Sequence, residues 1–83
     1  MIDIMIDTRE YFVNKIVAVL RLYKKTHIVQ TVNNKVYIIV ADTLCRKFFK
    51  ELNLNTAGYS FWYNLKPHHE KSIIIEIIEG EQL

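Results

Sequence analysis

The sequence predicts an α+β fold in which two helices cover one face of a mainly antiparallel sheet. Apolar residues recur at helical spacing in two separate segments, and alternating apolar residues fill the segments between and after them. The chain has 83 residues, which is enough for one small core, so residues 1–83 are taken as a single domain.

The first helix is predicted over residues 8–24. Asp7 can act as its N-cap, and Glu10 follows three residues later, as in a capping box. Its apolar stripe consists of Phe12, Ile16, Val19, Leu20 and Tyr23, widened by Val13 and Val17. Before this helix, isoleucine occupies every second position from Ile2 to Ile6, which predicts an additional N-terminal strand.

A β-hairpin is predicted over residues 28–32 and 35–40. These segments flank Asn33-Asn34, and asparagine tolerates the positive φ that both central residues of a type I′ turn require. A two-residue turn here places Val32 opposite Lys35 and makes one face of the hairpin nearly all apolar. We expect that face to meet the helices.

A second helix is predicted over residues 43–52, with Asp42 as its N-cap. One side of this helix is apolar and includes Cys45, which we therefore expect to be buried as a small hydrophobic residue. The apolar side comprises Leu44, Cys45, Phe48, Phe49 and Leu52.

Two closing strands are predicted over residues 59–65 and 72–79, joined by a polar loop at 66–71. With the N-terminal strand the order becomes βαββαββ, a ferredoxin-like arrangement with one extra strand. Both helices would then cover one sheet face and leave the other free. That free face should be apolar and aromatic, which is typical of an interface, and its expected anchors are Trp62, Ile74 and Ile78.

The overall charge identifies no partner. Eleven basic residues against nine acidic ones leave a net charge of +2. The single Cys45 excludes an internal disulfide and any metal site built from several cysteines. The N-terminus is acidic where a secretory leader would be basic, and no apolar run reaches the ~18 residues that cross a bilayer. We expect a cytoplasmic protein with no membrane partner.

The aromatic stretch GYSFWY at residues 58–63 loosely resembles the RNP1 strand of RNA-recognition domains, in which alternate rings stack bases. However, no basic residue precedes it, and it follows the second helix, whereas RNP1 precedes that helix. We therefore expect Tyr59, Phe61 and Tyr63 to fill the core beneath the helices, with Trp62 outside.

Basic residues gather on both predicted helices, and such clusters favour binding to phosphates because neutralised phosphates release their counterions. Charged helix faces are equally typical of any solvated helix, so the relative placement of the two clusters decides between these interpretations. The candidate nucleic-acid-binding residues are Arg21, Lys24, Lys25, Arg46, Lys47 and Lys50, with Trp62 available to stack on a base.

No motif predicts catalysis, a cofactor or a metal centre. His68, His69 and Glu70 are suitable metal ligands, but adjacent residues on a strand point apart, so we expect only a polar loop. The acidic residues lack a neighbouring lysine of the kind that magnesium-dependent nucleases use, and no nucleophile lies beside a base. We predict that the protein is not an enzyme.

Ile, Lys, Asn, Tyr and Phe, whose codons are rich in A and T, dominate the composition. In size and composition the chain is similar to the small open reading frames of crenarchaeal viruses and plasmids. That resemblance implies a viral protein in the cytoplasm of the host cell, and proteins of this kind commonly act on DNA or RNA.

Two functional hypotheses follow. The first is a nucleic-acid-binding or regulatory protein that uses the basic helix faces. The second is a protein–protein interaction or inhibitor module, which forms a homodimer or binds a host or viral protein through the apolar sheet face or a strand edge.

Overall fold

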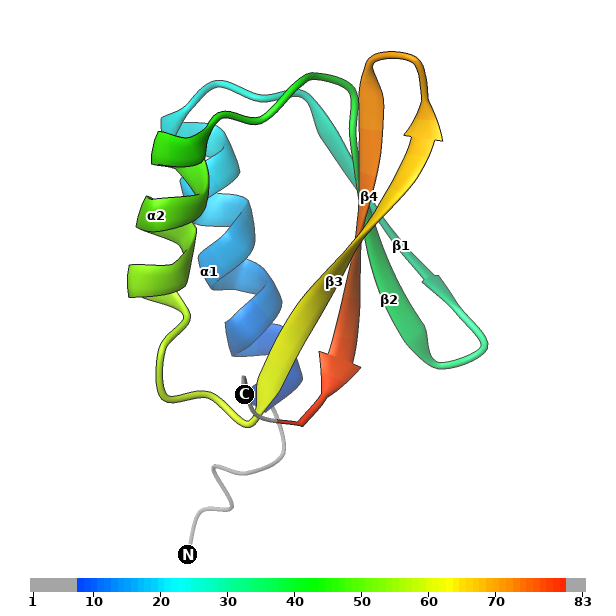
Figure 1. Ribbon diagram of the computed structural model, residues 1–83. Helices are drawn as coiled ribbons and strands as arrows, with labels where there is room; N and C mark the ends of the chain where they lie inside the picture. Colours follow the sequence, from blue (N-terminus) through cyan, green and yellow to red (C-terminus); the bar gives the residue numbers. More distant parts are fainter. Residues whose placement is uncertain (1–7, 81–83) are drawn as a thin grey trace, which may run out of the picture.

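Both helices lie on the same side of a four-stranded antiparallel sheet (Figure 1). This confirms the predicted α+β class. The computed structural model describes residues 8–80. The elements are α1 (Thr8–Leu22), β1 (His27–Val32), β2 (Lys35–Val40), α2 (Arg46–Asn55), β3 (Phe61–His69) and β4 (Ser72–Glu79).

The order of the described elements is αββαββ, so the ferredoxin-like βαββαββ order is not matched. Helix α1 precedes every described strand, and the N-terminal strand predicted at residues 2–6 lies outside the described residues, as does the Asp7 cap. Within the sheet the order is β1-β2-β4-β3, and each neighbouring pair is antiparallel. The two central strands are therefore β2 and β4.

The described chain consists of two consecutive αββ units joined between β2 and β4. The sheet order is the one that a twofold axis between these strands would produce, with the first strand of each unit at an edge. Inward-facing residues repeat 36 positions apart from α1 to α2 and its C-cap, and 37 apart in the central strands, and all of them are buried except Ile73, which is partly buried. The corresponding residues are Phe12, Ile16 and Leu20 with Phe48, Leu52 and Thr56, and Val36, Ile38 and Val40 with Ile73, Ile75 and Ile77.

The core lies between the helices and the central strands. Ile38 and Ile75 face each other across the β2–β4 pair, and both side chains are fully buried. Each such side chain stabilises the fold by roughly 1.5–3 kcal/mol through removal from water. Tyr63 is buried, and Tyr59 and Phe61 pack against the core, which confirms the prediction for these rings.

The first hairpin has the predicted turn and register. Asn33 and Asn34 have φ of 52° and 66°, as both central residues of a type I′ turn require. Val32 pairs with Lys35 and Val29 with Ile38. The guanidinium of Arg9 in α1 donates a 2.8 Å hydrogen bond to the carbonyl oxygen of Asn34, which ties the tip of the hairpin to the helix layer.

The predicted start of the second helix was wrong by three residues, because Asp42 does not cap it. The Asp42 carboxylate instead accepts hydrogen bonds from the backbone N–H of Thr43 at 2.7 Å and from Lys25 Nζ at 3.2 Å. Helix α2 begins at Arg46, and Cys45 is its N-cap residue. The thiol of Cys45 is exposed, which corrects the prediction that it is buried.

The predicted loop at residues 66–71 is mostly strand. Strand β3 continues through His69, and only Glu70 and Lys71 form the turn to β4. Pro67 is tolerated because β3 is an edge strand, where a missing N–H need not break the ladder. A register shift between Pro67 and His69 inserts one residue, which explains why the repeat spacing changes from 36 to 37.

Helix α1 ends in a Schellman motif at Lys24. The N–H of Lys24 donates to the carbonyl of Arg21 at 3.0 Å, and the N–H of Lys25 donates to that of Leu20 at 2.8 Å. Lys24 has φ of 56°, a left-handed conformation that normally favours glycine. A lysine therefore occupies a position where its Cβ strains the backbone.

Replacement Lys24→Gly should stabilise the fold by about 1 kcal/mol, because glycine adopts the left-handed conformation without the Cβ clash. For a domain of this size the melting temperature should rise by about 4–8 °C. Lys24→Ala is the control, since it removes the same charge but keeps the Cβ and should give no such rise. Equal melting temperatures for the two variants would contradict this explanation.

Candidate functional site

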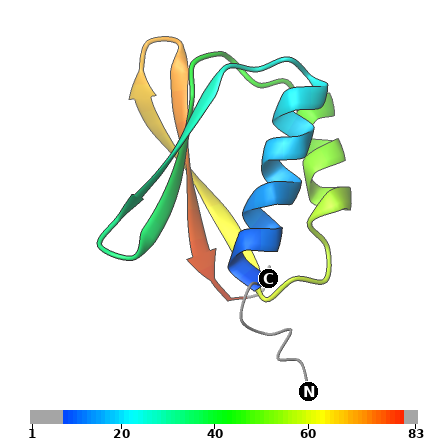
Figure 2. The same ribbon diagram turned by 180° about the vertical axis from the view of Figure 1, so that it is seen from behind.

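The two basic clusters lie at the same end of the helix layer. Helices α1 and α2 run antiparallel, so the C-terminal end of α1 and the N-terminal end of α2 are neighbours in both views (Figures 1 and 2). The ring of Tyr23, just after α1, meets that of Phe48 in the first turn of α2 edge to face, with centroids 5.5 Å apart. We call the region formed by the C-terminal end of α1 and the N-terminal end of α2 the basic end.

Most cationic side chains of the basic end are open to solvent. Arg21 lies in the last turn of α1 and Lys24 two residues after the end of that helix, and the other exposed cations belong to α2. Of the predicted nucleic-acid-binding residues, only Lys25 forms an ion pair with another residue of the 8–80 segment. The exposed members are Arg21, Lys24, Arg46, Lys47 and Lys50.

The N-terminus of α2 adds to this positive potential. Arg46 and Lys47 occupy its first turn, where no acidic residue stands, and within the described chain no side chain caps it. Backbone N–H groups at a helix N-terminus carry a partial positive charge that favours an anion and disfavours a cation. The positive charges of Arg46 and Lys47 therefore oppose the dipole of α2 and lower the stability of its first turn.

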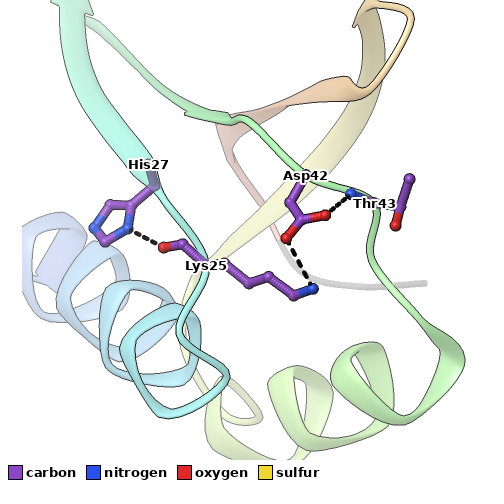
Figure 3. Close-up of polar contacts among 4 residues, drawn as sticks. All are labelled: Lys25, His27, Asp42 and Thr43. Carbon is purple, nitrogen blue, oxygen red and sulfur yellow. Dashed lines mark hydrogen bonds and ion pairs between the residues drawn. The ribbon is translucent and has the colours of Figure 1, made fainter.

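Lys25 differs from the other members because it is part of the internal structure (Figure 3). Its ammonium lies 3.2 Å from the Asp42 carboxylate, and its side chain is 21% exposed. The backbone N–H of Thr43 and the Lys25 ammonium together lower the pKa of Asp42. This pair links the segment after α1 to the segment before α2.

Trp62 does not join the basic end. On β3 it lies opposite Ile78 of β4, and the pleat assigns it to the sheet face that the helices leave uncovered. Its ring is partly buried, with its centroid 4.6 Å from that of Tyr63. The sequence-based grouping of Trp62 with the helix cations is therefore not supported by the geometry.

The uncovered sheet face carries the three residues predicted for an interface. Trp62, Ile74 and Ile78 are all partly buried there. In their midst, the Glu76 side chain is only 8% exposed, and its oxygens lie 3.9 Å from Lys35 Nζ and 3.2 Å from Lys66 Nζ. Sequence reasoning missed this cluster, although a lone glutamate within the isoleucine run of β4 was the available signal.

The histidine pair forms no metal site with its neighbours. His68 Nδ1 lies 2.9 Å from Ser72 Oγ, which also accepts a hydrogen bond from the His69 backbone N–H at 3.1 Å. Across residues 8–80, no group of three or more His, Cys, Asp or Glu side chains is placed to hold a metal ion.

No protein-family model matches the chain, and no curated protein is significantly similar to it in sequence. Neither α1 nor α2, the helices found in residues 8–80, has the length and apolar character needed to cross a membrane.

The Asp42 contacts should make the free energy of unfolding depend on pH in the acidic range. Because the folded pKa lies below the ordinary value of 3.8, the contribution is complete above about pH 4 and is lost as the pH falls through the folded pKa. Asp42→Asn should lower the melting temperature at pH 7, and its difference from the parent protein should shrink below about pH 4.

Thermal melts between about pH 7 and pH 2.5 test this expectation. Lys25→Gln is the informative control, because it leaves the Thr43 hydrogen bond, the larger cause of the shift, in place. It should retain most of the acid dependence. A constant difference between Asp42→Asn and the parent protein across this range would contradict the assignment.

Proposed function

We infer that the protein binds nucleic acid through the basic end and acts without catalysis. The observation that carries this proposal is that antiparallel helices bring two basic clusters, separate in the sequence, to one end of the molecule. A row of phosphates is the ligand that suits several exposed, spaced cations, because each phosphate that is neutralised releases a counterion.

The first turn of α2 supports the same ligand. Arg46 and Lys47 lie where positive charge costs roughly 0.3–1 kcal/mol of helix stability. A bound phosphate would reverse this effect by accepting hydrogen bonds from the free N–H groups and neutralising the cations. A solvated helix face needs no cations at this particular position, so their placement favours an anionic partner.

The proposal covers DNA and RNA alike, because contacts to phosphates carry no sequence information. It places the protein in the cytoplasm, where it would occupy a nucleic acid or regulate access to it. The uncovered sheet face and Trp62 have no role in this contact.

Fluorescence anisotropy with single- and double-stranded DNA and RNA probes tests the proposal. Affinity should fall steeply with salt, and for duplex DNA the plot of log K against log salt should have a slope no steeper than about −4.5, set by five exposed cations. Failure to bind any of the probes at low salt would contradict the proposal.

The variant Lys47→Glu distinguishes an effect on binding from an effect on folding, because it should weaken nucleic-acid binding while it stabilises the fold. An acidic residue in the first turn of α2 should raise the free energy of unfolding by about 0.3–1 kcal/mol. Affinity for the same probe should fall about five- to tenfold, and the salt slope should become shallower by about 1.

Lys15→Glu is the matched control, since it makes the same charge change on an exposed lysine in the middle of α1. It should leave the affinity close to that of the parent protein. Equal losses of affinity for the two variants would show that total charge, and not the basic end, determines binding.

A further inference from the structure

The two edges of the sheet differ in how they are protected. Edge strand β3 carries Pro67, a bulge and Lys66, all features that discourage pairing with another strand. Edge strand β1 has the sequence HIVQTV, with no proline, lysine or acidic residue, and its ladder with β2 is regular. Nothing in β1 blocks the addition of a further strand.

The side chains of β1 are exposed on both faces of the sheet. Ile28 and Val32, on the face away from the helices, are 58% and 50% exposed, and Val29, on the helix side, is 43% exposed. These apolar residues lie on a strand whose outer edge is not paired with any part of the chain between residues 8 and 80. Exposed apolar residues along an open edge are typical of a pairing surface.

The backbone groups at this edge can be assigned from the register. The N–H of Ala41 donates a 3.0 Å hydrogen bond to the carbonyl of Thr26, in line with the β1–β2 pairing. Hydrogen-bonded and non-hydrogen-bonded positions alternate along an antiparallel pair, so the even-numbered residues of β1 bond to β2. The N–H and C=O groups of Val29 and Thr31 therefore point to the open edge.

The pattern of free N–H and C=O groups along β1 is self-complementary when two β1 strands pair in an antiparallel arrangement. A twofold axis at Gln30 places Val29 of one copy opposite Thr31 of the other, so that groups with free N–H and C=O meet each other. The same register places Ile28 of one copy opposite Val32 of the other on the outer face, in a non-hydrogen-bonded pair where side chains lie closest. Each exposed aliphatic side chain thus meets a β-branched one.

The helix side also has room for the added strand. A groove of about 580 Å³ runs between α1 and β1, with Val13, Val17 and the charged Arg9, Glu10 and Arg21 on the helix wall and Val29 and Thr31 on the strand wall. Strands in a sheet lie ~4.8 Å apart, so a strand added to β1 would place its own Val29 and Thr31 beside this groove. It would shield the exposed apolar side chains of both copies.

We propose that two copies of this chain form a homodimer by antiparallel pairing of their β1 strands, which joins the two four-stranded sheets into one continuous sheet. The strand edge, and not the flat outer face of the sheet, is the interface. Arg21 of the basic end also lines the groove beside β1, and the dimer presents two basic ends, one from each copy.

Sedimentation and disulfide trapping test the proposal. Sedimentation equilibrium between about 1 µM and 1 mM should show a monomer–dimer equilibrium. In a Cys45→Ser background, Gln30→Cys should form an intermolecular disulfide readily, because the axis brings the two Cα atoms to ~4.5 Å in a non-hydrogen-bonded pair. Asn64→Cys, exposed on the outer face of the β3 edge, is the matched control and should cross-link only at the rate of random collision.

A charge swap tests the register. Ile28→Lys alone and Val32→Glu alone should each weaken dimerisation about tenfold or more, because each places a charge against an aliphatic side chain of the other copy. The double variant Ile28→Lys/Val32→Glu should recover dimerisation, since the new ammonium and carboxylate then face each other across the axis.

A parent protein that stays monomeric across this concentration range would overturn the proposal. Equal cross-linking of Gln30→Cys and Asn64→Cys would also overturn it. Failure of the double variant to recover would reject the register with its axis at Gln30.

Discussion

The pairing of β2 with β4 is the contact on which the rest of the structure depends. Each αββ unit contributes one apolar strand face to a single shared core. Joining the units places Ile38 opposite Ile75 and sandwiches the apolar faces beneath both helices. Over their shared register, β2 and β4 have a paired strand on both sides, whereas within residues 8–80 β1 and β3 each pair on one side.

The same contact determines where functional surfaces can form. An antiparallel join between two αββ units makes their helices antiparallel, and this brings the end of α1 and the start of α2 together. This join also places the first strand of each unit at an edge of the sheet that residues 8–80 form. Pro67 and a bulge protect the β3 edge, whereas β1 has no such features.

Local chemistry was predictable from the sequence, and long-range choices were not. Asn33-Asn34 determines its own turn, and that turn sets the register of the first hairpin. Asp42 carries the same local signal as an N-cap, yet its carboxylate bonds to Thr43 and Lys25, a partner 17 residues away. The basic clusters were visible from their spacing, but their convergence depends on the sheet order, as does the separation of Trp62 from them.

Amide hydrogen exchange followed by NMR tests the central role of the β2–β4 pair most directly. If this pair holds the two units together, the amides of β2 and β4 should exchange slowest, with a free energy of opening equal to that of global unfolding. The amides of α1, α2 and the edge strands should open at lower free energy. Slower hydrogen exchange at amides of either helix or of β3 than at those of β2 and β4 would contradict this account.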